Sequence, residues 1–148
     1  MFLLTSCLND SNDTSTYYGD TAITAFTLGT LNRYTHVKTS TGKYSTYKTT
    51  LTGSSYYFYI DQVNKTIYNP DSLPIWTDNS KVVCTITSKN GGLIYSKSLK
   101  SDSIFYHNSS DSVDFSQPRT FYVYATDGSG YRQYTIKVNV HQELSDTF

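Results

Sequence analysis

Apolar and polar side chains alternate along most of this chain from Tyr17 onward, and this two-residue period is the feature that most restricts its fold. Successive side chains of a β-strand point to opposite faces, so alternation is typical of a strand with one buried face. Phe121, Val123 and Ala125, for example, fall on one face of the segment 120–126. No window keeps a helical period. The pattern predicts an all-β protein.

Composition supports this prediction. The 148 residues include three alanines and one glutamate, against 22 threonines, 20 serines and 15 tyrosines. Alanine and glutamate favour helices, whereas threonine and tyrosine suit the pleated surface of a sheet. The length is that of one domain.

Turn residues divide the alternating stretches into strands. Ser40-Thr41-Gly42 and Asp127-Gly128-Ser129-Gly130 predict hairpin turns, and Pro70 and Pro74 predict a rigid connection outside any ladder. We expect strands over 23–28, 33–39, 43–51, 56–60, 65–68, 82–87, 120–126 and 131–140, and the segments 93–95 and 104–106 carry a shorter and weaker strand signal. The expected core positions are Phe26, Leu28, Val82, Cys84, Ile86, Phe121, Val123, Ala125, Tyr134, Ile136, Val138 and Val140. Counted as roughly seven to nine strands over residues 21–142, this spacing predicts an immunoglobulin-like two-sheet sandwich, with a barrel as the alternative.

The N-terminus predicts export. Leu4-Thr5-Ser6-Cys7 resembles a bacterial lipobox, in which the peptide bond before the cysteine is cut and the thiol carries a lipid. We therefore expect residues 1–7 to be a truncated lipoprotein signal peptide, Cys7 to be the lipidation site and residues 8–20 to be a polar tether. The alternative is that residues 1–7 form the first strand of the domain, but the polar tract that follows could not continue a buried strand.

Several ordered blocks of sequence carry a family resemblance. They are Ala22–Phe26, Phe58–Gln62, Ile67–Pro74, Asp114–Ser116 and Asp127–Arg132. In this order they resemble a Bacteroides-type surface lipoprotein family of unknown function. The resemblance implies a lipidated N-terminus, an outer-membrane location that faces the outside of the cell, and an immunoglobulin-like sandwich usually followed by a kelch-like propeller region. Residues 143–148 would then begin a linker to such a region. The family offers no catalytic residues to transfer.

Charge and motif content point away from enzymes and nucleic acid. Twelve basic and twelve acidic residues cancel, so no overall basic bias favours phosphate contacts, and no apolar run is long enough for a transmembrane helix. His36, His107 and His141 lie on separate segments, which predicts no metal site and no cofactor. The aspartates sit beside Ser, Asn or Gly, as turn residues do. Cys84 is expected to behave as a small hydrophobe.

Two further expectations concern sugars. Trp76, Tyr122 and Tyr124 are candidate contacts of a glycan platform, and the alternative is that the tyrosines pair with one another across strands. Thr21, Ser72, Ser103 and Ser112 follow an aspartate in the pattern at which Bacteroides-group cells O-glycosylate exported proteins, which would require exposed hydroxyls. The sequence thus favours a non-enzymatic, lipid-anchored envelope module that docks or spaces a protein partner. The alternative function is that of a glycan-binding module in a polysaccharide-utilisation system.

Overall fold

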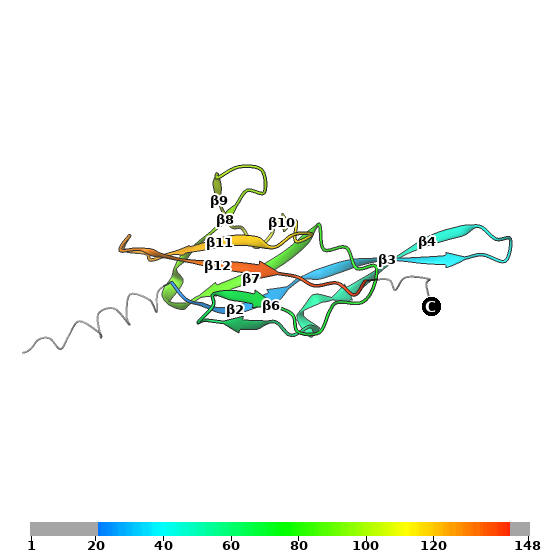
Figure 1. The fold of residues 1–148 in the computed structure, drawn as a ribbon, viewed down its shortest axis with the longest axis horizontal. Helices are drawn as coiled ribbons and strands as arrows, with labels where there is room; N and C mark the ends of the chain where they lie inside the picture. Colours follow the sequence, from blue (N-terminus) through cyan, green and yellow to red (C-terminus); the bar gives the residue numbers. More distant parts are fainter. Residues whose placement is uncertain (1–20, 143–148) are drawn as a thin grey trace, which may run out of the picture.

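A computed structural model describes residues 21–142 as a body of β-strands (Figure 1). The signal peptide, Cys7, the tether and the linker predicted above therefore lie outside the described residues. Within the described part, no helix is long and apolar enough to cross a membrane. The strands are β2 (Ile23–Leu28), β3 (Thr30–Lys38), β4 (Tyr44–Thr52), β5 (Tyr59–Asp61), β6 (Thr66–Tyr68), β7 (Val82–Ser88), β8 (Leu93–Lys97), β9 (Ile104–Tyr106), β10 (Ser112–Val113), β11 (Arg119–Tyr124) and β12 (Tyr131–Lys137). Two short 3₁₀ turns, η1 (Gly53–Ser55) and η2 (Lys89–Gly91), complete the elements.

Two sheets form the sandwich. The smaller has the order β10-β7-β2 and the larger the order β5-β6-β12-β11-β8-β9. The neighbours β2-β7-β10 and β12-β11-β8 match the A-B-E and G-F-C strands of an immunoglobulin domain. Strand β6 pairs in parallel with β12 and antiparallel with β5. The predicted all-β, immunoglobulin-like sandwich is confirmed.

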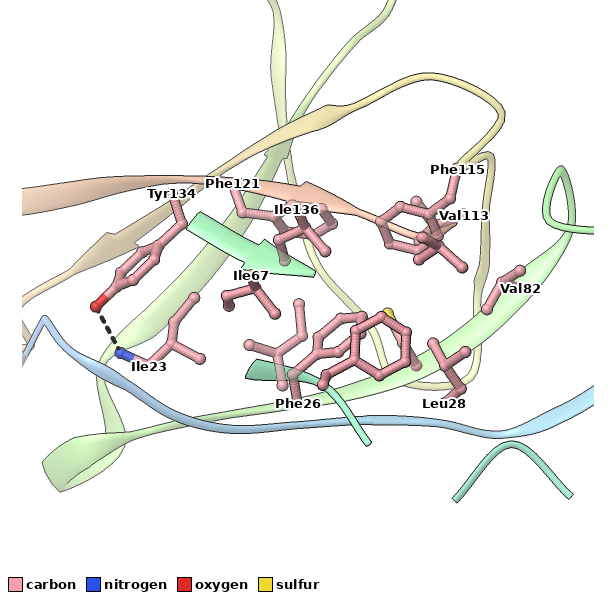
Figure 2. Packing of buried hydrophobic residues seen from close by; sticks show 14 of the residues in the cluster. Ile23, Phe26, Leu28, Ile67, Val82, Val113, Phe115, Phe121, Tyr134 and Ile136 are labelled. Atoms are coloured by element: carbon pink, nitrogen blue, oxygen red, sulfur yellow. Dashed lines mark hydrogen bonds between the residues drawn. The ribbon is translucent and has the colours of Figure 1, made fainter. Parts of the chain in front are cut away.

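The core lies between these sheets, as Figure 2 shows. Phe26 from β2 meets Phe58 edge to face at 4.9 Å between ring centroids, and Phe115 stacks on Phe121 at 6.2 Å. Such aromatic contacts contribute about 0.5–1.5 kcal/mol beyond the burial of their area. All of the expected core positions are buried except Val140, which packs against the core as a half-buried side chain.

Three details of the prediction were wrong. Within residues 21–142, the two sheets of the sandwich hold three and six strands, which agrees with the predicted seven to nine, and the hairpin adds two more; the two-residue strand β10 was missed because its length gives no periodic signal. Strand β5 begins at Tyr59 instead of Tyr56, because Phe58 turns into the core before pairing begins. Strand β12 ends at Lys137 instead of Val140, where its parallel partner β6 also ends ahead of Pro70.

The hairpin of β3 and β4 leaves the sandwich. Its ladder runs from the pair Thr30–Thr52 to the pair Lys38–Tyr44, and it forms a separate two-stranded sheet. In Figure 1 the hairpin extends along the long axis of the molecule, and its tip lies at the opposite end from the start of β2. Leu31 is buried at its base, whereas both faces are exposed toward the tip.

Candidate ligand-binding face

Five tyrosines gather on the outer face of the larger sheet. Tyr122 and Tyr124 of β11 point away from the core because Phe121 and Val123, with the opposite parity, point into it. The antiparallel register places Tyr131 opposite Tyr124, Tyr95 opposite Tyr122, and Tyr106 opposite Tyr95. We call this set, Tyr95, Tyr106, Tyr122, Tyr124 and Tyr131, the tyrosine face.

The rings of the tyrosine face contact one another. Tyr95 meets Tyr106 at 5.7 Å and Tyr124 at 5.5 Å, both edge to face. Tyr131 lies 5.2 Å from Tyr124 and 5.8 Å from Tyr122. The cross-strand pairing that we considered as the alternative is therefore present. Tyr106 and Tyr131 nevertheless keep 62% and 52% of their surface exposed, which leaves area for a stacked ligand ring.

Trp76 does not join this face. Its ring meets the His36 ring at 5.3 Å, and the Arg33 guanidinium carbon lies 6.0 Å from the ring centroid. Tyr34 donates its amide proton to the Trp76 carbonyl at 3.1 Å, so Trp76 is held beside β3. The expectation of one platform containing Trp76, Tyr122 and Tyr124 is corrected, since their ring contacts belong to two separate groups. Trp76 is half-buried.

Sequence reasoning missed three members of the tyrosine face. Tyr131 could have been predicted, because the turn at 127–130 places it opposite Tyr124 in a tight hairpin. Tyr95 and Tyr106 were not, because they enter through the pairing of β8 with β11 and β9, and no local motif gives that register.

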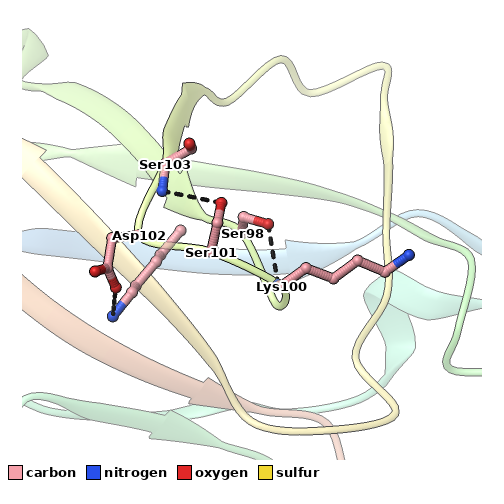
Figure 3. Close-up of polar contacts among 6 residues, drawn as sticks. Ser98, Lys100, Ser101, Asp102 and Ser103 are labelled. Atoms are coloured by element: carbon pink, nitrogen blue, oxygen red, sulfur yellow. Dashed lines mark hydrogen bonds and ion pairs between the residues drawn. The ribbon is translucent and has the colours of Figure 1, made fainter.

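The four predicted O-glycosylation positions differ in exposure. Ser72, Ser103 and Ser112 are exposed, but Thr21 is fully buried, so it does not meet the requirement for an accessible hydroxyl in the folded domain. Ser103 follows a short loop in which its amide donates to the Ser101 hydroxyl at 3.3 Å (Figure 3). Modification at Ser72, Ser103 and Ser112 stays a prediction, and the intact mass of protein from its native host would test it.

The same loop borders a shallow cavity of about 360 Å³, which Pro118 and Thr120 also line. Lys97 pairs with Asp102 at 3.4 Å across it, and Asp102 is fully exposed. An exposed pair of this kind contributes little to stability. Arg119 on its wall donates to the carbonyl oxygens of Asp114 and Lys97 at 3.0 and 2.8 Å, so this guanidinium is used in holding the loop.

Cys84 and His107 are the one cysteine and histidine that meet in the described part of the chain. The sulfur lies 3.9 Å from Nε2, but the same nitrogen is 3.2 Å from the Cys84 carbonyl oxygen. If Nε2 carries the proton for that carbonyl, it cannot accept one from the thiol. Burial raises the pKa of the Cys84 thiol to about 12, which keeps it protonated at neutral pH. The predicted role of Cys84 as a buried apolar residue fits these facts.

The carboxylates of Asp114 and Asp127 accept hydrogen bonds within their own turns. Hydrogen bonds from Ser116 hold the pKa of Asp114 below its ordinary value, and Ser129 has the same effect on the pKa of Asp127. Each aspartate accepts from an amide two residues later, at 2.8 and 2.9 Å. Across residues 21–142, no group of three or more histidine, cysteine or acidic side chains is placed to hold a metal ion.

These features define the class of protein as an immunoglobulin-like β-sandwich with an aromatic outer face and a projecting hairpin. Residues 26–138 match the family described as a domain of unknown function (DUF6242) N-terminal domain, and the chain belongs to that family. No curated protein matches the chain. No solved structure matches it either.

Proposed function

We propose that this protein is a non-enzymatic interaction module that is anchored to the bacterial envelope through a lipid on Cys7 and presents binding surfaces away from the membrane. The observation that carries the proposal is the placement of the two ends of the domain. The start of β2, to which the tether would connect, lies at one end of the long axis, and the hairpin tip lies at the other (Figure 1).

A rigid sandwich between anchor and hairpin would act as a spacer. Backbone pairing in two sheets and a shared core fix the distance between its ends, whereas the polar tract 8–20 would set the height above the membrane. The resemblance to Bacteroides-type surface lipoproteins supports an outer-membrane location, and a kelch-like region after residue 148 would also be held outward. Several acyl chains, at about 0.8 kcal/mol per buried methylene, suffice for stable anchoring.

The anchor is tested by expressing the complete gene in a Bacteroides host and separating membranes from soluble protein. Cys7→Ala should move the protein from the membrane to the soluble fraction. Cys84→Ala is the matched control because it removes the other cysteine, and it should stay in the membrane fraction. A Cys7→Ala protein that remains with the membranes would contradict the proposed lipid anchor.

A second candidate function, favoured by the exposed rings of Tyr106 and Tyr131, is glycan binding at the tyrosine face. The apolar face of a sugar ring stacks on an aromatic side chain, and neighbouring rings in fixed positions reduce the entropic cost of ordering the site. Starch, xyloglucan and mannan are suitable neutral probes for calorimetry. We expect Tyr131→Ala to weaken binding of a recognised glycan about tenfold, and Tyr57→Ala, at an exposed position on another part of the chain, to leave it unchanged. Absence of binding to an array of neutral glycans would exclude this second function.

A further inference from the structure

The β3–β4 hairpin carries a local charge that the net charge of the chain conceals. Between Thr30 and Thr52 there are four basic side chains, Arg33, Lys38, Lys43 and Lys48, and no aspartate or glutamate. This segment therefore holds a third of the twelve lysine and arginine residues of a chain whose net charge is zero. We call residues 30–52 the basic hairpin.

The cations of the basic hairpin form no ion pair with the described residues. Within residues 21–142 the ion pair of the structure joins Lys97 to Asp102, and none of the four cations of the hairpin takes part. Two acidic residues lie near the base: Asp78, whose backbone amide donates to the Asn32 carbonyl at 2.8 Å, and Asp71, which lines a cavity together with Arg33. One oxygen of the Asp78 carboxylate accepts from the amide and hydroxyl of Ser80, at 2.9 and 2.5 Å, and these bonds leave its negative charge in place near the base.

The fold does not need the outer part of this hairpin. From His36 to Thr50 most side chains are exposed, and the residues of the core cluster within β3 and β4 are Leu31 and, partly, Leu51 at the base. A two-stranded hairpin without a packed face is only marginally stable in water, so the outer part of this hairpin adds little to the stability of the domain. Such an element is better explained by contact with something outside the domain.

Two lysines and several aromatic rings share one face of the basic hairpin. Register and strand parity place Tyr34, His36 and Lys38 of β3 on the same face as Lys48, Thr46 and Tyr44 of β4, in three directly opposed pairs. Residues two apart along a strand are separated by about 7 Å. Trp76 lies beside this row along the edge of β3, where its carbonyl accepts from the Tyr34 amide and its ring meets His36. Tyr44, in the last pair before the tip, is 75% exposed.

We propose that this face of the basic hairpin binds an acidic polysaccharide, meaning a chain whose sugars carry carboxylate or sulfate groups. The lysines supply charge for the acidic groups, and the rings of Tyr34, Tyr44 and Trp76 supply stacking surfaces for the sugars between them. An extended polymer fits an extended ribbon that has no enclosed pocket. The proposal depends neither on the lipid anchor nor on the tyrosine face.

Duplex DNA and a membrane fit this face less well than an acidic polysaccharide does. Binding to duplex DNA draws its strength from many phosphate contacts, whereas this face offers Lys38 and Lys48, and the chain as a whole has no positive surplus. An anionic membrane would attract the lysines but would not use a row of rings spaced along a ribbon. Single-stranded nucleic acid would use both the lysines and the rings. Nucleic acid and lipid are therefore outcomes that the experiment must separate from polysaccharide.

The experiment measures binding of the purified 148-residue chain to polygalacturonate and to dextran sulfate by calorimetry. Neutral dextran, single-stranded DNA and phosphatidylglycerol vesicles are the comparison probes. We expect binding to at least one acidic polysaccharide, weaker binding when NaCl is raised from about 50 to about 200 mM, and none to neutral dextran. The double variant Lys38→Gln with Lys48→Gln should lower the affinity about tenfold or more.

Two matched variants separate this site from general charge effects. Lys65→Gln with Lys89→Gln removes the same charge from exposed positions near the start of β2, and it should change the affinity by less than about twofold. Lys38→Arg with Lys48→Arg keeps the charge and should keep binding. Tyr44→Ala tests the rings and should weaken binding while leaving the thermal unfolding temperature unchanged, since Tyr44 is exposed.

Three results would overturn the proposal. The first is no binding to either acidic polysaccharide. The second is an equal loss of affinity in the two glutamine pairs, because the site would then not be the hairpin. The third is tighter binding to DNA or to the vesicles than to both polysaccharides, which would assign the basic hairpin to a different partner.

Discussion

The buried hydroxyl of Tyr134 accepts a hydrogen bond from the backbone amide of Ile23 at 3.1 Å, and so joins two residues 111 positions apart (Figure 2). The same hydroxyl donates to the side-chain oxygen of Gln62, whose amide group donates to the Ile23 carbonyl at 2.7 Å. Tyr134 is fully buried on β12, and Ile23 begins β2. A single side chain thus fastens the first described strand of one sheet to the last strand of the other.

Tyr134→Phe should therefore destabilise the domain although it keeps the aromatic ring. The change leaves a buried amide of Ile23 and the Gln62 oxygen without this partner, which costs about 1–3 kcal/mol. Urea unfolding followed by circular dichroism measures this free energy. Tyr124→Phe, on the half-buried tyrosine face, is the control and should stay within about 0.5 kcal/mol of wild type. Equal effects of the two substitutions would contradict the role given to the Tyr134 hydroxyl.

The contact between Tyr134 and Ile23 illustrates what the sequence could predict. Alternation placed Tyr134 in the core and Ile23 at the start of a strand, and both predictions are confirmed. The hydrogen bond between them depends on how the sheets stack, which no local pattern encodes. The same reason explains Trp76, whose neighbours could not be deduced because its segment pairs with β3 through the bridge from Arg33 to Thr77.

The projection of the β3–β4 hairpin was also beyond the sequence. Its alternation of tyrosine, threonine and valine is that of an ordinary sheet strand, so local preference is the same whether a sheet neighbour exists or not. The lack of large apolar residues after Leu31 on β3 was the available signal, since Val37 is the one aliphatic residue between Tyr34 and Tyr47. The four basic residues of the hairpin could be read from the sequence, but the net charge of zero for the whole chain concealed this local excess.

Gly53→Ala should disrupt the base of the basic hairpin. A Cβ atom at Gly53 would lie 2.0 Å from the Gly29 carbonyl oxygen and 2.7 Å from the Leu28 Cβ, and the Gly53 amide donates to that same carbonyl at 3.1 Å. Because the obstructing oxygen belongs to backbone, the strands must move apart. We expect a loss of about 3 kcal/mol or more in the free energy of unfolding.

Thr52→Ala is the neighbouring control for this change, since Thr52 is exposed and its substitution adds no atom. Its cost should be below about 1 kcal/mol by the same urea measurement. A Gly53→Ala protein with wild-type stability would mean that the approach of Gly53 to Gly29 is looser than described.

Asn69→Ala should detach the segment after β6 from the end of β12. Asn69 is almost fully buried, its amide donates to the carbonyls of Asn139 and Asp71 at 2.8 and 3.1 Å, and its side-chain oxygen accepts from the Asn139 amide at 2.7 Å. Removing three hydrogen bonds in one buried site costs about 2–5 kcal/mol.

Hydrogen exchange of the Asn139 amide measures the local effect of Asn69→Ala, and thermal unfolding measures the global one. Asn108→Ala is the control, because its exposed side chain bonds only within its own turn, to Ser110. Unchanged protection of Asn139 in Asn69→Ala would show that water replaces the lost partner without cost.

Cys84 provides a prediction about alkaline pH. Because burial raises the pKa of its thiol to about 12 from an ordinary value of 9.0, the folded protein keeps this proton after the unfolded chain has lost it. The contribution of the Cys84 thiol to the free energy of unfolding is complete below about pH 9 and is lost progressively toward about pH 12.

Other groups titrate in the same range, so the difference in the free energy of unfolding between wild type and Cys84→Ala isolates the effect of the thiol. Wild type should be the more stable at pH 8, since alanine leaves a small cavity, and its advantage should fall by about 1 kcal/mol at pH 10. Urea unfolding at both pH values in a Cys7→Ser background measures this, and the same protein at pH 8 should react with a thiol reagent only after unfolding. An advantage that does not shrink between the two pH values, or rapid labelling of the folded protein, would show that Cys84 is accessible to water.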